Sequence, residues 1–360
     1  MKSSNPKNER VKRDYADYLR HADGKAEQTV RQIEKAILRY EDFTGFADFG
    51  TFNQQVARRF KEDLAKQDLA KATIFSTVTA LKRFFGWPAM QSGYKRKISL
   101  TEVDFLSLSS KDARAAKAPA DKAYPTLEQI ERVLGAMSDQ TPIEKRDRAL
   151  MAFTILTGIR DGAMVTLRLK HVEVEPRRVV QNPNEVATKA SKRIVTYFFP
   201  VGAEIEQIVI DWVRYLREEL LFGDDDPVFP KSAMSHDANM CFVATNLARE
   251  FWSGAGQVRG IFKAAFEHAG LRAFTPHSFR NTLVQIAYQR KLSHAEMKAW
   301  SQNLGHESML TTLSSYGKIP VEQQGELVRQ AKLDNDGERP VTAGELEAIL
   351  REIRGQVGTK

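Results

Sequence analysis

Hydrophobic positions in the first hundred residues recur at helical spacing. From Thr29 to Phe43 the apolar side chains lie three or four residues apart, which is the pattern of an amphipathic helix with one buried face. The same spacing predicts helices over Phe52–Lys66 and Lys71–Phe85. We therefore expect residues 25–106 to form a helical domain, preceded by a flexible basic N-terminus over residues 1–24.

This pattern is interrupted between Ser107 and Lys122. The segment is polar and rich in alanine, has few large apolar residues, and contains Pro119. We interpret residues 107–122 as an interdomain linker. A chain of 360 residues is long enough for two domains that each bury a core, so a second domain is expected over residues 123–335.

The second domain carries clear signals for the ends of helices. Thr126 and Gln129 have the spacing of a capping box ahead of an apolar stripe, and Ser293 and Glu296 repeat that spacing. A helix over residues 142–157 should end at Gly158, because glycine readily takes the left-handed conformation that follows a helix. Apolar stripes predict further helices over residues 203–221 and 257–269.

Between His171 and Phe199 the period changes to short β-branched runs, separated by Pro176 and by an Asn-Pro-Asn turn at residues 182–184. This stretch predicts a small antiparallel sheet in a domain whose remainder is helical. A further capping box at Thr342 opens a predicted helix over residues 343–354, so residues 336–360 are expected to form a helical tail.

The net charge is +8, and the basic excess lies in the first third of the chain. Residues 1–120 contain 23 lysines and arginines against 15 aspartates and glutamates, whereas residues 121–360 contain 31 of each. Residues 71–100 have no acidic side chain, and they contain both basic and aromatic residues, which together suit a nucleic-acid surface. Alternatively, the aromatic residues form the core. The candidate DNA-binding residues are Lys71, Lys82, Arg83, Lys95, Arg96 and Lys97.

Cys241 is the only cysteine, so an intramolecular disulfide is excluded. No apolar run approaches the roughly 20 residues that a membrane helix needs, and the N-terminus has no apolar stretch typical of a secretory signal. We expect a cytoplasmic protein with no membrane partner.

The second domain also holds residues suited to phosphate chemistry. Cleaving DNA without a metal requires a nucleophile, cationic donors for the non-bridging oxygens, and an acid for the departing 5′ oxygen. Arginine fits the second role because its planar fork makes bidentate bonds to phosphate. The relevant stretches are Thr157-Gly158-Ile159-Arg160, Thr188-Lys189-Ala190-Ser191-Lys192-Arg193, Pro276-His277-Ser278-Phe279-Arg280, Leu304-Gly305-His306, and Tyr316 ten residues further on.

This set of motifs, in this order, resembles the tyrosine recombinase or phage integrase family over residues 25–335, with its specific part in residues 150–318. The resemblance implies one active site, made of Arg160, Lys189, His277, Arg280, His306 and Tyr316. It further implies that the tyrosine attacks the scissile phosphate to give a 3′-phosphotyrosine, without a metal, a cofactor or ATP. The fold it implies is mainly α, with an N-terminal helical DNA-binding domain and a mostly helical catalytic domain that carries the small antiparallel β-sheet.

Charge and pKa suggest roles for these residues. Arg160 and Arg280 stay cationic at any working pH and can clamp the non-bridging oxygens, to which His306 adds a donor. Lys189 is the expected general acid, with Lys192 as its rival, and His277 is the expected general base. His277 and Arg280 are three residues apart, so on one helical turn they would share a face.

Two positions depart from the family pattern. Many members carry a carboxylate three residues after the first arginine, where this chain has Ala163, so Arg160 must be oriented from elsewhere, for example by Asp161. The interval from His306 to Tyr316 is one residue longer than the family's usual spacing. Tyr288, the nearest alternative hydroxyl group, falls within a predicted helix.

The function implied is site-specific recombination. The expected partners are double-stranded DNA recombination sites, a homotetramer assembled on synapsed DNA, and an accessory directionality factor, at the nucleoid. In relatives the C-terminal region docks onto a neighbouring protomer; packing against its own domain is the alternative. Two other functions are a non-catalytic DNA-binding protein, which gives no reason for the ordered motifs, and a type IB topoisomerase, which shares the chemistry.

Overall fold

The computed structural model describes residues 4–118, 123–188, 192–236, 242–290 and 292–306. The chain divides into two compact units, unit 1 over Met1–Ala120 and unit 2 over Asp121–Lys360, and the division falls inside the segment interpreted as a linker. The helices of unit 1 are α1 Pro6–His21, α2 Glu27–Thr44, α3 Gln54–Lys66, α4 Lys71–Gly86, α5 Leu100–Val103 and α6 Ser110–Lys117, with 3₁₀ turns η1 Phe49–Thr51 and η2 Pro88–Met90.

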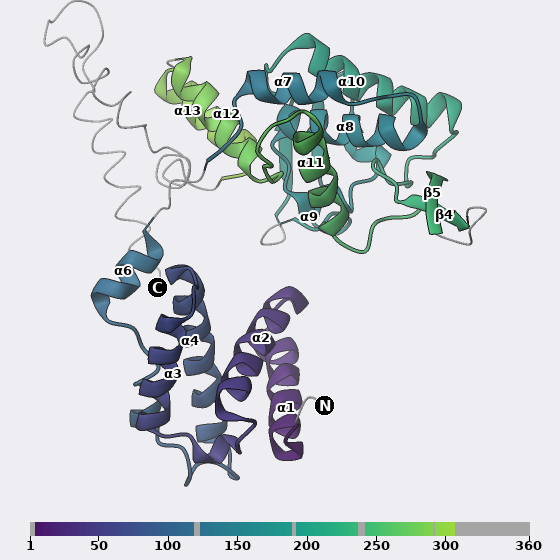
Figure 1. The fold of residues 1–360 in the computed structure, drawn as a ribbon. Coiled ribbons are helices and arrows are strands. Elements are labelled where there is room, and N and C mark those ends of the chain that lie inside the picture. The colour runs from purple at the N-terminus through teal and green to yellow at the C-terminus, as the bar shows by residue number, and fades with distance from the viewer. Residues whose placement is uncertain (1–3, 119–122, 189–191, 237–241, 291, 307–360) are drawn as a thin grey trace, which may run out of the picture. The chain divides into compact units, whose positions relative to one another are not determined.

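Helix α4 lies at the centre of unit 1, where it contacts α2, α3, α5 and α6 (Figure 1). Its Phe84 and Phe85 are fully buried, and Phe85 stacks on Phe52 with ring centroids 4.1 Å apart. Phe49 meets Phe84 edge to face at 4.9 Å. The interpretation of the aromatic residues as core is therefore confirmed for Phe84 and Phe85, and an aromatic cluster holds unit 1 together.

The prediction of a flexible N-terminus is wrong for residues 6–21, which form α1. The Asn5 side chain caps the helix by accepting from the Lys7 backbone N–H, and Pro6 stands in its first turn, a position that suits proline. Val11, Tyr15 and Leu19 are buried in the core of unit 1. Their spacing of four residues is a helical signal, which the charge of this segment obscured.

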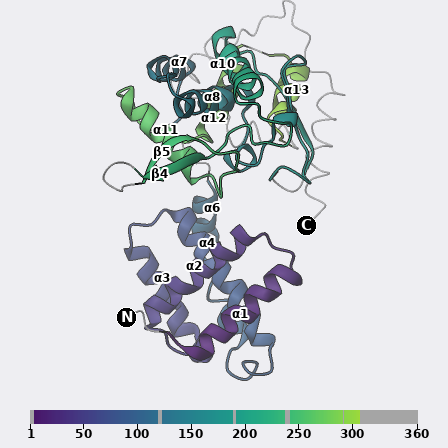
Figure 2. The same ribbon diagram turned by 90° about the vertical axis from the view of Figure 1, so that its right-hand side faces the viewer.

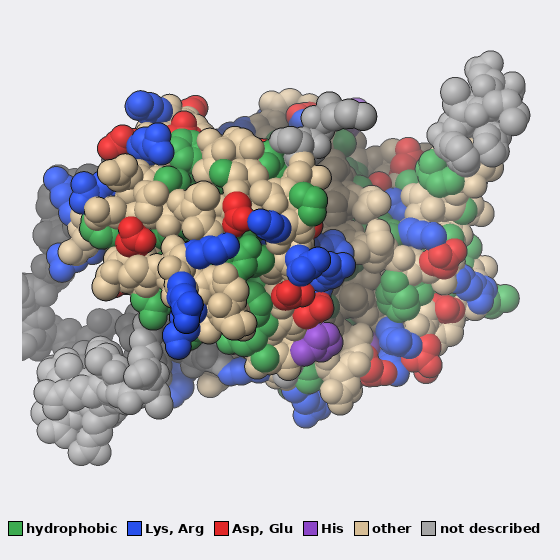
Figure 3. All heavy atoms as spheres, turned by 90° about the horizontal axis from the view of Figure 1, so that it is seen from below, with side chains coloured by type: hydrophobic (Ala, Val, Ile, Leu, Met, Phe, Trp, Pro, Cys, Tyr) green, Lys and Arg blue, Asp and Glu red, His purple; other side chains and the backbone are tan. Residues whose placement is uncertain are grey.

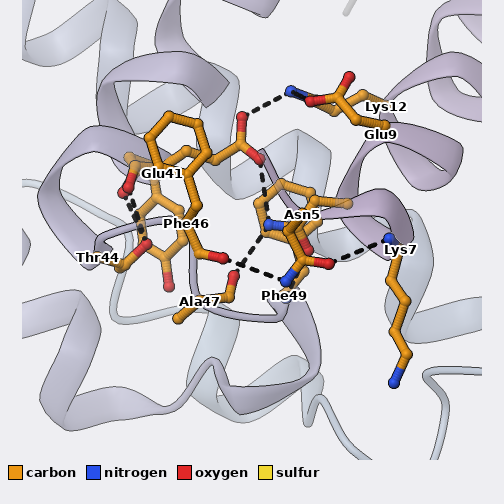
Figure 4. A network of polar contacts seen from close by, with 11 residues as sticks. Asn5, Lys7, Glu9, Lys12, Glu41, Thr44, Phe46, Ala47 and Phe49 are labelled. Carbon is orange, nitrogen blue, oxygen red and sulfur yellow. Dashed lines mark hydrogen bonds and ion pairs between the residues drawn. The ribbon is translucent and has the colours of Figure 1, made fainter. Parts of the chain in front are cut away.

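A buried polar network joins α1 to the end of α2 (Figure 4). The Glu41 carboxylate is fully buried, and it accepts from the Asn8 amide at 3.1 Å and from the Lys12 ammonium at 2.7 Å. Asn8 also donates to the carbonyl oxygen of Ala47 and accepts from the N–H of Phe49. The fold tolerates the burial of the Glu41 carboxylate because the carboxylate is paired with the Lys12 ammonium and accepts a hydrogen bond from Asn8.

The segment interpreted as a linker contains a helix. α6 begins after Ser109, whose hydroxyl accepts from the N–H of Asp112, and it contacts α4. The Lys117 ammonium lies 5.1 Å from the centre of the Phe75 ring. Alanine is a good helix former, so the Ala-rich composition favours this helix over an extended linker.

Unit 2 is built around α8, which α7, α10 and α12 contact; these helices lie side by side in Figure 1 and Figure 2. Every residue of α8 from Ala149 to Thr157 is buried. The helices are α7 Leu127–Ala136, α8 Pro142–Thr157, α9 Asp161–Met164, α10 Ala203–Arg214, α11 Gly256–His268, α12 Ser278–Gln289 and α13 His294–Asn303, with a 3₁₀ turn η3 Leu169–His171 and a π-helical turn η5 Tyr215–Glu219.

The predicted antiparallel sheet is confirmed as β1 Val172–Glu173, β2 Arg178–Gln181 and β3 Ile194–Tyr197, in the order β1-β2-β3. Strand β3 is an edge strand and pairs only with β2 among the described strands. A second, two-stranded sheet of β4 Ser232–His236 and β5 Phe242–Leu247 follows α10. This second sheet was not predicted, because β4 contains no β-branched residue that would mark a strand.

The mainly helical fold class is confirmed, and so are the capping boxes of α7 and α13. In the part of the chain that the structure describes, none of the helices is long and apolar enough to cross a membrane. The helix predicted over residues 343–354 lies outside the described residues.

Candidate active site

The end of α8 places Arg160. Gly158 follows the helix with φ 60°, in the left-handed region, as the sequence predicts. The Thr157 hydroxyl donates to the carbonyl oxygen of Phe153 at 2.6 Å. Arg160 then precedes α9 in an extended conformation and is half-buried; its carbonyl oxygen accepts from the N–H groups of Ala163 and Met164, and its side chain makes no hydrogen bond or ion pair with another described residue. Its guanidinium can therefore meet a ligand without breaking a bond described in the protein.

Gly158 also lies against another motif. A Cβ atom added there would come within 2.7 Å of Leu304 Cδ2 and 3.0 Å of Leu283 Cδ1. Leu304 belongs to the Leu-Gly-His motif, and Leu283 to the helix that carries Arg280. Glycine is thus required at this position for two reasons, the positive φ and the close approach of the Leu304 and Leu283 side chains.

Arg280 joins three of the predicted motifs. It lies in the first turn of α12, and only 1% of its surface is exposed. Its Nη1 donates to the carbonyl oxygen of Gly158, and its Nη2 donates to the carbonyl oxygen of Leu304 at 2.6 Å and lies 2.7 Å from His306 Nε2. One buried guanidinium on α12 therefore binds Gly158, which lies 122 positions earlier in the chain, and Leu304, which lies 24 positions later.

A second left-handed glycine places His306. Gly305 has φ 67°, and the N–H of His306 donates back to the carbonyl oxygen of Ser301 at 3.1 Å, which ends α13. A Cβ atom at Gly305 would meet Ile194 Cδ1 at 3.1 Å, so the motif lies against the start of β3. His306 itself is 7% exposed and turns toward Arg280.

His277 stands immediately before α12, and its carbonyl oxygen accepts from the N–H of Arg280. Its side chain is exposed, whereas that of Arg280 is buried. The two residues are one helical turn apart, as expected, but they differ in their surroundings.

Asp161 does not hold Arg160, contrary to the possibility raised by Ala163. Its Oδ2 accepts from Arg259 of α11, at 3.0 Å from Nε and 2.8 Å from Nη2. Its Oδ1 accepts from the N–H of Gly162. The carboxylate thus fixes the backbone next to Arg160 to α11 rather than orienting the guanidinium.

Lys189 and Tyr316 lie outside the described residues. Lys192 is described, at the start of the segment that leads into β3. Asn303 was not among the predicted site residues; its side chain accepts from the N–H of Tyr197 at 2.7 Å and donates to the carbonyl oxygen of that residue at 2.8 Å. Nothing in the spacing of the motifs signals this contact. Within the described ranges, no three His, Cys, Asp or Glu side chains are grouped so that they could hold a metal ion.

The candidate DNA-binding residues of unit 1 fall into two groups. Lys82 pairs with Asp104 at 2.9 Å, and Arg83 pairs with Asp23 at 3.0 Å. Lys71, Lys95, Arg96 and Lys97 form no ion pair with a described residue. On the face shown in Figure 3, basic side chains are interspersed with acidic ones. The number of basic residues is therefore a poor guide to which cations can meet phosphates.

The model of the phage integrase family matches residues 125–321. Among curated proteins, the chain is 24% identical to tyrosine recombinase XerC of Chromohalobacter salexigens, over 77% of this chain and 84% of that protein. It is 22% identical to tyrosine recombinase XerC of Halalkalibacterium halodurans, over 82% of this chain and 88% of that protein.

Two solved structures share the fold. One is a lambda integrase dimer bound to a COC′ core site, with a TM-score of 0.58, 15% identity, and coverage of 92% of this chain and 99% of that chain. The other is the Tn1549 transposon integrase in complex with transposon right end DNA, with a TM-score of 0.54, 17% identity, and coverage of 89% and 99%.

Proposed function

The chain belongs to the phage integrase family, and on that premise we propose that it is a site-specific tyrosine recombinase. It cleaves and rejoins DNA strands through a 3′-phosphotyrosine intermediate, with no need for a metal or ATP. The names of its relatives support this proposal, since those proteins are tyrosine recombinases and integrases.

One observation carries the proposal. The Arg280 guanidinium bonds to Gly158, Leu304 and His306, so the segments bearing the Arg, His-x-x-Arg and Leu-Gly-His motifs meet at one point. Motifs that are far apart in the sequence have no reason to converge in a protein that only binds DNA. A cationic cluster around one point suits a phosphate that gains negative charge in the transition state.

The chemical step is a transesterification. A bond forms between the Tyr316 oxygen and phosphorus while the bond from phosphorus to the 5′ oxygen breaks. The phenol proton passes to His277, whose side chain is exposed. A proton from Lys189, or from its rival Lys192, goes to the leaving oxygen. Arg160 stabilises the charge on the non-bridging oxygens, and Arg280 does so once its buried guanidinium becomes accessible to the phosphate.

The partner of the enzyme is double-stranded DNA. The structural relatives named above were solved with a core site and with transposon end DNA. In unit 1, Lys71, Lys95, Arg96 and Lys97 are the residues we propose for phosphate contacts, because no described carboxylate neutralises them. Lys82 and Arg83 would first have to leave Asp104 and Asp23.

Assembly is the finer part of the proposal. Four copies act on two synapsed DNA sites at the nucleoid, and an accessory factor sets the direction of the reaction. The amphipathic segment at residues 343–354 docks onto a neighbouring protomer. A truncation after residue 335 that still forms complete synaptic complexes would contradict this docking.

The proposal is tested with a nicked suicide substrate, from which the cleaved strand end escapes. The full chain should form a covalent protein–DNA adduct in the presence of EDTA, and Tyr316→Phe should form none. Peptide mass analysis of the adduct places the phosphotyrosine, and Tyr288→Phe is the matched control, which should still form the adduct. An adduct that persists in Tyr316→Phe would refute the assignment.

A further inference from the structure

Glu185 lies at the centre of a polar network next to the turn that carries the two candidate lysines. Its carboxylate accepts from the Lys170 ammonium at 2.5 Å and from His171 Nε2 at 3.1 Å. His171 is buried, and its Nδ1 accepts from the N–H of Arg168 at 3.1 Å. The imidazole therefore has its N–H on Nε2, directed at Glu185.

The network reaches a third segment. Lys170 also pairs with Asp225 at 2.9 Å, and Arg168 pairs with the same carboxylate oxygen at 3.0 Å. The hydrogen bond from Lys170 lowers the pKa of Glu185, and His171 adds to this effect. Glu185 is therefore ionised wherever the enzyme would work, and both of its oxygens are engaged.

Residues 182–193 connect β2 to β3 and include Lys189 and Lys192; we call them the lysine turn. Glu185 and Ala187 fix its first half. The N–H of Ala187 donates to the Thr166 hydroxyl at 2.9 Å, and Thr166 follows α9 closely, six residues after Arg160. The first half of the lysine turn is thus fixed to the segment that carries Arg160.

Strand β3, into which the lysine turn leads, is held by the His306 segment. Strand β3 is an edge strand, and the Asn303 side chain pairs with both backbone groups of Tyr197 as a neighbouring strand would. The Thr196 hydroxyl adds a bond to the carbonyl oxygen of Asn303 at 3.0 Å. The described first half of the lysine turn is therefore tied to the Arg160 segment, and the strand that follows the turn is tied to the His306 segment.

We propose that Glu185 is a positioning residue for the general acid, and that its bonds to Lys170 and His171 hold the lysine turn so that a lysine reaches the departing 5′ oxygen. This inference rests on the proposed function, because it concerns the proton transfer of that reaction. Proton transfer requires hydrogen-bond reach, so a small displacement of the lysine turn lowers the rate of cleavage without weakening DNA binding.

The chemistry of the leaving group separates this role from a general effect on folding. In a substrate with sulfur in place of the bridging 5′ oxygen, the leaving group is a thiolate. Thiols have a pKa near 8.5, far below that of an alcohol, so the bond to phosphorus breaks without a donated proton. Any variant that fails only in delivering the proton should cleave this substrate at the wild-type rate.

The experiment measures adduct formation in single turnover with the oxygen and the sulfur substrates. Glu185→Ala should be slower by about 10–100-fold on the oxygen substrate and within about twofold of wild type on the sulfur substrate. Glu185→Gln, which keeps one acceptor oxygen, should be intermediate. Lys189→Ala or Lys192→Ala, whichever removes the acid, should show the same rescue, and Arg160→Ala should not.

The matched control is Glu173→Ala. Glu173 pairs with Arg178 at 2.7 Å on the same sheet and is similarly exposed, but it makes no described contact with the lysine turn. It should react normally with both substrates. An equal defect of Glu185→Ala on both substrates, or full activity on the oxygen substrate, would overturn the inference. Failure of the wild-type chain to form an adduct with either substrate would instead refute the proposed function.

Discussion

Helices α2 of unit 1 and α8 of unit 2 end in the same way. Each is followed by a glycine in the left-handed region, Gly45 with φ 64° and Gly158 with φ 60°. Their surroundings differ. An added Cβ atom would meet nothing within 4 Å at Gly45, whereas at Gly158 it would meet Leu304 at 2.7 Å. The same local rule ends one helix at an open position and the other inside a site.

The charges near the two helix ends differ as well. In the last turn of α2, Glu41 is neutralised by Lys12 from the adjacent helix, so the charge is used within the fold (Figure 4). At the end of α8, Arg280 comes from a distant part of the chain to bind the carbonyl oxygen of Gly158, and Arg160 has no described partner. A cationic side chain with no described partner in the protein remains available to bind a substrate.

The largest expected effect comes from Arg160→Ala. Because the side chain has no described partner, the free energy of unfolding should change by less than about 0.5 kcal/mol. Adduct formation on the suicide substrate should fall about 10²–10³-fold, since a donor to the transition state is lost. Arg160→Lys should recover part of this activity, although lysine cannot replace the bidentate fork.

Arg148→Ala is the control, in helix α8, which ends just before Arg160. Arg148 donates to the carbonyl oxygen of Leu134 and pairs with Asp139 at 2.7 Å, so its bonds serve the fold. The variant should lose about 1–2 kcal/mol of stability and keep its cleavage rate. If Arg160→Ala unfolded the protein instead, the contrast between the two helix ends would be broken.

A smaller effect is expected from Gly158→Ala, compared with Gly45→Ala. Both variants place a side chain in the left-handed region, which costs about 1–2 kcal/mol. Gly158→Ala must also displace Leu304, and should cost about 2–4 kcal/mol while slowing adduct formation. Denaturant unfolding and the single-turnover cleavage rate measure the two effects. Equal losses of stability at the two glycines would show that the approach of Leu304 is unimportant.

The smallest effect concerns Lys12 at high pH. Burial by itself lowers the pKa of Lys12, but its hydrogen bonds to Glu41 and Glu9 raise the pKa overall above its ordinary value of 10.5. A folded-state pKa that is raised stabilises the protein below pH 10.5, and this contribution is lost as the pH rises through the raised value. The difference in unfolding free energy between wild type and Lys12→Met should therefore shrink at alkaline pH.

Lys7→Met is the control for that measurement, because the ammonium of Lys7 is largely exposed and lies 3.6 Å from Asp48. Exposed pairs contribute little, so its stability should match that of wild type at every pH. If the unfolding free energy of Lys7→Met depended on pH as strongly as that of Lys12→Met, the burial of Glu41 would not be the cause of the effect.

Local patterns predicted much of the fold, because capping residues and apolar stripes act over a few residues. Helix α8 was predicted with both of its ends, and the sheet of β1, β2 and β3 was predicted from its β-branched runs. Helix α1 was missed although Val11, Tyr15 and Leu19 follow helical spacing, because the segment is also highly charged. The β4–β5 pair was missed because β4, unlike the strands of the first sheet, contains no β-branched residue that would mark a strand.

In the candidate site, too, some features depend on neighbours along the chain and others on tertiary contacts. The sequence by itself determined the residue types and their order, and it placed Gly158 at a helix end, since these depend on neighbours along the chain. Only the tertiary structure decided that Arg280 would be buried against Gly158, Leu304 and His306, that Asp161 would pair with Arg259, and that Arg83 would pair with Asp23. Those contacts join residues between 24 and 122 positions apart, and such distances are fixed by how the helices pack, which no local pattern encodes.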